Sequence, residues 1–139
     1  MKSVLAAVDG SDGSRRAASF ARDVAQVFRA RLIFLHVIEP LQRAGVHGPD
    51  ESASGYYARQ MRWAAEFLKD LADELQVAES EQIVEMGRPG DVICREAHER
   101  NADLIVLGAH GHGSGSRLIL GSVAGRAAAS ATGSVTIVR

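Results

Sequence analysis

The chain has 139 residues, of which 46% are hydrophobic and 24% are charged, a balance that is ordinary for a globular protein. We therefore expect a single domain over residues 1–139. The formal net charge of −1 gives no electrostatic reason to expect nucleic acid or anionic lipid as a partner. The single cysteine excludes an internal disulfide, and no apolar run approaches membrane-spanning length, so we expect a cytoplasmic protein.

Short apolar runs alternate with helical patterns along the chain. The apolar runs predict strands at residues 3–8, 31–38, 82–86, 103–107 and 134–138. Apolar residues that recur every three or four positions predict helices after the turns at 9–14 and 87–91, over about 56–77 and over 123–130. This alternation indicates a parallel sheet with helices on both faces. The expected product is an open, doubly wound, five-stranded α/β fold of the Rossmann-like kind, with strand order 3-2-1-4-5.

Apolar stripes on the first two predicted helices should face the sheet. The first stripe consists of Ala17, Phe20, Ala21, Val24, Val27 and Phe28. The second consists of Tyr57, Met61, Ala64, Leu68, Leu71 and Leu75, and it is core or dimer surface rather than a cofactor site. Ser11 or Asp12 is suited to cap the first helix, and Asn101 is suited to end the third in the left-handed conformation.

Residues 39–55 interrupt the alternation of strands and helices. Two prolines and two glycines, Pro40, Gly45, Gly48 and Pro49, break any regular element there. A loop of this length in a compact domain is a lid, a binding loop or a disordered segment, and the sequence leaves these alternatives open.

The segment from Gly108 to Ser122 is rich in glycine and joins a buried strand to the start of a helix. Glycine allows an anion to approach main-chain amides closely, and a helix start supplies unpaired N–H groups. In an open α/β sheet the ligand lies beyond the carboxyl ends of the strands where the winding reverses, which here is between strands one and four. Asp9 and Gly108 should therefore face one crevice. We expect this crevice to hold the phosphates of a nucleotide.

Two common phosphate-binding motifs do not match this segment. The P-loop pattern requires lysine where Ser114 stands, and the dinucleotide pattern requires a third glycine where Ser116 stands. What remains is Gly108-x2-Gly111-x9-Gly121-Ser122, which resembles the nucleotide-binding signature of the universal stress protein family. The resemblance spans the whole chain. It departs at Ser134, where the family usually has proline before the last strand.

The resemblance implies a site for ATP. In the family, an aspartate at the position of Asp9 lies on the ribose and phosphate side, and main-chain groups at the position of Val37 hold adenine. Mg²⁺ would enter with the phosphates rather than through a cage of protein ligands. The family often forms homodimers through the edge of its terminal strand. The contact residues that we expect are Ala7, Asp9, Val37, Leu107, Gly108, Gly111, Gly113, Gly121, Ser122 and Val123.

These assignments have structural alternatives. Asp9 could be a helix cap without any contact to a ligand, and Gly108 could permit close packing of a strand on a helix. His110 and His112 could be a pair of metal ligands. The leading hypothesis is an ATP-binding regulatory or stress-response protein. A slow ATP hydrolase and an adaptor that dimerises without ligand are the alternatives. Hydrolysis requires a base and a group that orients it, and no such pair is recognisable.

Overall fold

Five parallel strands form the sheet of the computed structural model, which describes residues 1–41, 52–112 and 120–139. The strand order is β3-β2-β1-β4-β5, so the predicted α/β fold and its strand order are confirmed. The predicted contact residue Gly113 lies outside the described residues, as do Ser114 and Ser116 of the same segment and the predicted loop residues Gly45, Gly48 and Pro49. The strands are β1 (Ser3–Ala7), β2 (Arg31–Ile38), β3 (Glu81–Met86), β4 (Leu104–Gly108) and β5 (Ser134–Val138).

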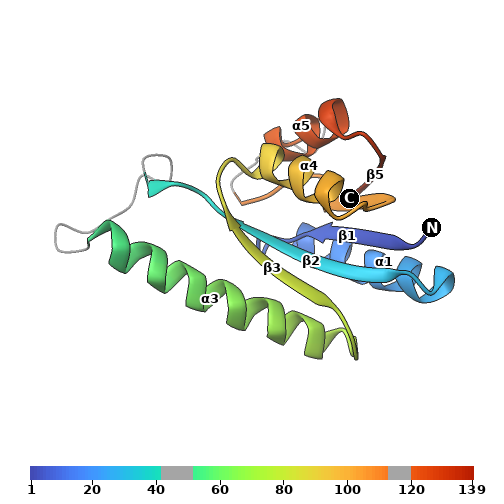
Figure 1. The fold of residues 1–139 in the computed structure, drawn as a ribbon, viewed down its shortest axis with the longest axis horizontal. Helices are drawn as coiled ribbons and strands as arrows, with labels where there is room; N and C mark the ends of the chain where they lie inside the picture. The colour runs from blue at the N-terminus through green and yellow to red at the C-terminus, as the bar shows by residue number, and fades with distance from the viewer. Residues whose placement is uncertain (42–51, 113–119) are drawn as a thin grey trace.

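Helices cover both faces of the sheet, as the alternation of elements predicts (Figure 1). One face carries α1 (Asp12–Phe28) and α3 (Ala53–Glu74), and the other carries α4 (Pro89–Glu99) and α5 (Ser122–Ser130). Among the described residues, no helix combines the length and the apolar character needed to cross a membrane.

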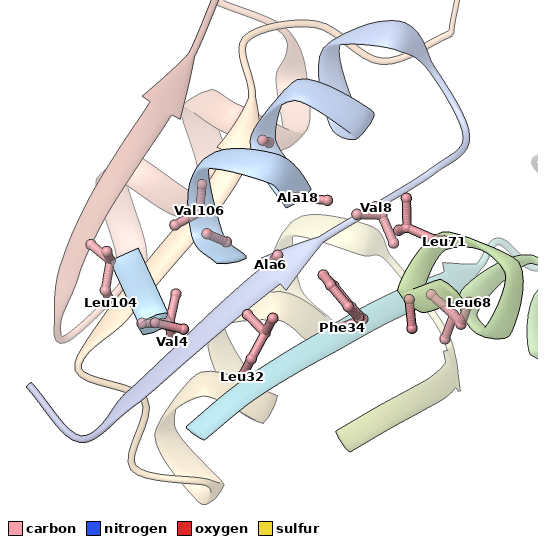
Figure 2. Close-up of a cluster of buried hydrophobic side chains, with 14 of the residues drawn as sticks. Val4, Ala6, Val8, Ala18, Leu32, Phe34, Leu68, Leu71, Leu104 and Val106 are labelled. Atoms are coloured by element: carbon pink, nitrogen blue, oxygen red, sulfur yellow. The ribbon is translucent and has the colours of Figure 1, made fainter. Parts of the chain in front are cut away.

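Successive side chains of the strands enter two separate hydrophobic cores, because strand side chains alternate between the faces of a sheet. Figure 2 shows the core under α1 and α3, where Phe34 and Val8 lie toward Leu68 and Leu71 of α3, and Val4 lies beside Leu104. The intervening strand residues pack against α4 and α5. They include Leu5, Ile33, Leu35, Ile105 and Leu107. Burial on both faces explains why the central strands are continuously apolar.

The predicted helix ends agree with the structure. Ser11 is the N-cap of α1 and accepts a hydrogen bond from the amide of Ser14 at 3.2 Å. Asn101, which follows α4, has a φ of 51° and so adopts the predicted left-handed conformation. Helix α3 differs from the prediction at both ends: it begins a few residues earlier because Ser52 caps it by accepting from the amide of Gly55 at 3.1 Å, and it ends at Glu74 rather than near Val77.

The predicted inward stripes of α1 and α3 are partly wrong. On α1, Phe20, Val27 and Phe28 are 41%, 79% and 54% exposed. The residues of α1 that face the sheet are small, namely Ser14, Ala17, Ala18, Ala21 and Ala25. They bring the helix axis close to the strands, and large side chains are left on its flank because the contact has no room for them. On α3, Met61 is 42% exposed, while Tyr56, Phe67 and Ala72 are buried instead.

Candidate functional site

A cavity of about 400 Å³ lies at the carboxyl end of the sheet, where the loops after β1 and β4 face each other. This is the crevice that the strand order predicts, because β1 and β4 are neighbours whose following connections leave toward opposite faces. The volume falls within the range of about 300–1,000 Å³ that small-molecule sites occupy. The predicted contact residues that the structure describes all line it: Ala7, Asp9, Val37, Leu107, Gly108, Gly111, Gly121, Ser122 and Val123.

One end of the cavity is rich in main-chain amides. Helix α5 begins there, with Gly121 as its N-cap, and within the described residues no side chain caps it. The first hydrogen bond of the helix runs from the amide of Gly125 to the oxygen of Gly121 at 2.9 Å. The amides that precede Gly125 have no carbonyl to bond within the helix, and the helix dipole makes this end positive. An anion is the chemical partner that this end of the cavity fits.

The other end of the cavity lies at the end of β2, which β1 separates from β4. Val37 lines it there together with His36 and Glu39, and Pro89 and Ile93 of α4 add apolar surface to the cavity. Among the described lining residues there is no lysine or arginine, and the side chains of His110 and His112 are part of the lining. A flat apolar group at one end and an anion at the other are the two parts of a nucleotide.

Asp9 is held in one orientation by the first turn of α1. Its Oδ1 accepts from the amide of Ser11 at 2.9 Å and from the Ser11 hydroxyl at 2.6 Å. The amide of Asp9 donates to the Ser14 hydroxyl at 3.2 Å. Burial alone would raise the pKa of Asp9, but the hydrogen bonds from Ser11 and Ser14 and the nearby His112 together lower it below its ordinary value. Asp9 is therefore a fixed, charged hydrogen-bond acceptor on the wall of the cavity.

Gly108 and Gly111 are required by different neighbours. A Cβ at Gly108 would lie 2.8 Å from the main-chain carbon of Gly13, in the first turn of α1. A Cβ at Gly111 would lie 2.7 Å from Oδ2 of Asp9. Glycine at 108 therefore permits close packing of β4 on α1, which is the structural alternative for this residue. Glycine at 111 keeps a side chain out of the space beside the Asp9 carboxylate.

The structure adds a residue that the sequence did not single out. His36 of β2 is 8% exposed, and its Nδ1 lies 2.8 Å from the main-chain oxygen of Val8. Its ring meets that of Trp63 edge to face at a centroid distance of 5.2 Å. Burial lowers the pKa of His36 below its ordinary value, against the opposing effects of the Val8 hydrogen bond and the Asp9 charge. Its position in an otherwise apolar strand was the available signal.

Acidification should destabilise the fold through His36. In the unfolded chain this imidazole titrates near pH 6.5, about its ordinary pKa, whereas its folded pKa is lower. Below pH 6.5 the unfolded state therefore binds more protons, and the free energy of unfolding should decrease as pH falls from about 7 to 5. Urea denaturation at both pH values should show a smaller decrease for His36→Asn than for the wild type. The exposed His98→Asn is the control, and an equal decrease in both variants would contradict this assignment.

No group of three or more histidine, cysteine, aspartate or glutamate side chains is placed to hold a metal ion within residues 1–41, 52–112 and 120–139. His112 instead contacts the loop after β1, since its Nε2 lies 2.9 Å from the main-chain oxygen of Asp9. Any metal at this site would have to bring most of its ligands with it, as a metal bound to nucleotide phosphates does.

The fold and the cavity define a Rossmann-like α/β protein with a ligand crevice between β1 and β4. The chain belongs to the universal stress protein family, whose family model matches residues 1–139. It is 32% identical to a universal stress protein of Thermus aquaticus, over 99% of this chain and 98% of that protein.

Solved structures agree with this membership. The universal stress protein UspA from Lactobacillus plantarum superposes with a TM-score of 0.85 at 26% identity, covering 99% of this chain and 97% of that one. A universal stress protein solved in complex with cAMP superposes with a TM-score of 0.70 at 28% identity, covering 99% of this chain and 97% of that one.

Proposed function

We propose that this chain binds an adenine nucleotide in the crevice between β1 and β4 and acts as a nucleotide-dependent regulatory protein in the stress response. The observation that carries the proposal is the cavity itself, which has apolar lining at Val37 on the β2 side and unpaired amides at the start of α5, at Ser122, on the β4 side. These ends suit a base and a phosphate respectively. The relative solved with cAMP supports an adenine nucleotide as the ligand class.

We propose ATP with Mg²⁺ as the ligand in the cell. The glycine spacing Gly108-x2-Gly111-x9-Gly121-Ser122 matches the family's ATP-binding signature, and the start of α5 offers amides to a phosphate chain. Asp9 is a poor general base, because its pKa is lowered and its Oδ1 already accepts two hydrogen bonds. We therefore favour binding without efficient hydrolysis.

We also propose that the chain pairs with a second copy through β5. This strand lies at the end of the sheet and pairs with β4 on one side, so its other edge offers main-chain donors and acceptors. A symmetric dimer buries the same edge of both copies. Light scattering on the purified protein should give twice the mass of the chain. A monomer at all concentrations would refute the proposed dimer.

Titration calorimetry tests the nucleotide assignment directly. ATP with Mg²⁺, AMP and cAMP should each produce a binding isotherm, and GTP should bind more weakly because main-chain groups at Val37 are expected to recognise the edge of adenine. A ligand at about a hundred times its Kd should also raise the free energy of unfolding by about 2.7 kcal/mol. Absence of both heat and thermal shift with every adenine nucleotide, in protein first freed of bound small molecules, would refute the proposal.

A further inference from the structure

His112 connects the two loops that flank the cavity. It follows Gly111 in the loop after β4, and its Nε2 lies 2.9 Å from the main-chain oxygen of Asp9 in the loop after β1. A carbonyl oxygen can only accept a hydrogen bond, so Nε2 carries the proton and donates.

The turn that carries the accepting carbonyl lies next to Trp63 of α3. Gly10 has a φ of +88°, and a Cβ there would lie 3.7 Å from Cη2 of Trp63 and 3.8 Å from Nε2 of His112. Trp63 is itself stacked on Phe67, with ring centroids 5.2 Å apart and an interplanar angle of 6°. The turn at Asp9 and Gly10 therefore lies between the half-exposed ring of Trp63 and the imidazole of His112, and a side chain at residue 10 would contact both.

The donor, His112, belongs to the chain segment after β4, which contacts the amide-rich end of the cavity through Ala109. The amide of Ala109 donates to the main-chain oxygen of Val138 at 2.8 Å, and the amide of Gly121 donates to the main-chain oxygen of Ala109 at 2.9 Å. These bonds fix the loop after β4 at Ala109. His112 fixes it again three residues later, with Gly111 between the two points, so the Gly111 main chain is held next to the Asp9 carboxylate.

We propose that His112 is a positioning residue whose hydrogen bond to Asp9 holds residues 109–112, after β4, in the conformation that receives the phosphates of the nucleotide. The identity of the ligand rests on the proposed function, but the hydrogen bond does not. The loop is prepared before the ligand arrives, and a larger fraction of binding-competent molecules gives a proportionally lower apparent Kd. Because His112 acts at the phosphate end, its loss should weaken ATP and spare adenosine.

A matched pair of variants separates this hydrogen bond from the mere presence of a side chain. His112→Gln places an amide donor near the position of Nε2, whereas His112→Asn carries the same amide one methylene shorter and does not reach Asp9. Calorimetry should give His112→Gln an ATP affinity within about twofold of wild type, and His112→Asn an affinity about tenfold lower. For adenosine, both variants should stay within about twofold of wild type, as should His98→Asn for both ligands.

Two calorimetric outcomes would overturn the positioning role. Equal ATP affinities for the glutamine and asparagine variants would show that the hydrogen bond is unimportant. An equal loss for ATP and adenosine in the asparagine variant would show general damage to the cavity.

A measurement on the ligand-free protein tests the hydrogen bond independently of the ligand. The NMR order parameter of the Gly111 amide should be about 0.85 in the wild type and His112→Gln, and should fall below about 0.6 in His112→Asn. The same order parameter in all three proteins would refute the positioning role. If the wild type orders this loop as expected but binds neither ATP nor adenosine, the proposed function fails and the positioning of the loop stands.

Discussion

Replacing Gly111 with valine is expected to lower the affinity for ATP at least about a hundredfold, equivalent to about 2.8 kcal/mol of binding free energy. A Cβ at this position would lie 2.7 Å from Oδ2 of Asp9, and Asp9 cannot turn away without losing its hydrogen bonds to Ser11. The added methyl groups would therefore displace the carboxylate or the loop, or occupy the cavity itself. Titration calorimetry with ATP and Mg²⁺ measures the loss.

Gly125→Ala is the matched control for this substitution. Gly125 lies in α5, close in sequence to the same phosphate end, but a Cβ there has nothing within 4 Å. Alanine also favours helix, so this variant should bind ATP as the wild type does and be more stable by about 0.5–1 kcal/mol. Wild-type affinity in Gly111→Val would show that this loop does not contact the ligand.

Replacing Gly108 with alanine is expected to lower the free energy of unfolding by about 3 kcal/mol, near the upper end of the usual cost of overpacking. The new Cβ would lie 2.8 Å from the main-chain carbon of Gly13 and 3.1 Å from the main-chain nitrogen of Ser14. These are main-chain atoms in the first turn of α1, so they cannot move unless the helix end shifts away from β4. Urea denaturation monitored by circular dichroism measures the change.

Gly133→Ala provides the comparison for the Gly108 variant. A Cβ at Gly133 would lie 3.4 Å from the main-chain oxygen of Ala102, an ordinary contact, so this variant should unfold within about 0.5 kcal/mol of wild type. Unchanged stability of Gly108→Ala together with lost ATP binding would contradict the packing explanation and would assign this glycine to the ligand.

Gly108 and Gly111 show the limit of inference from a motif. Both belong to one spaced signature, which by resemblance to the family places them beneath ribose and phosphate, while close packing of a strand on a helix was the open alternative for Gly108. In the folded chain Gly108 faces Gly13 of α1, whereas Gly111 faces the carboxylate of Asp9. Two glycines of one motif therefore meet different neighbours, and glycine is required at each position for a different reason, which only the tertiary structure shows.

The order of residues was enough to predict the strands, the strand order and the crevice, because each depends on local patterns and on general rules of chain connection. Continuously apolar strands, helix caps such as Ser11 and the stop at Asn101 are all local signals. The same rules placed Asp9 and Gly108 at one crevice, since strand ends that share one edge of a sheet must meet, whereas the other contact residues came from the resemblance to the universal stress protein family.

Tertiary structure decided which residues of the predicted stripes on α1 and α3 pack against the sheet, and which side chains bridge the crevice. Phe20 and Val27 have the spacing of core residues, yet the alanines beside them make the contact with the sheet because a close helix leaves no room for large side chains. The hydrogen bond from His112 to Asp9 joins residues 103 positions apart. Neither residue type nor spacing encodes such a pair, because the distance between its atoms is set only when the strands, the helices and both loops are in place.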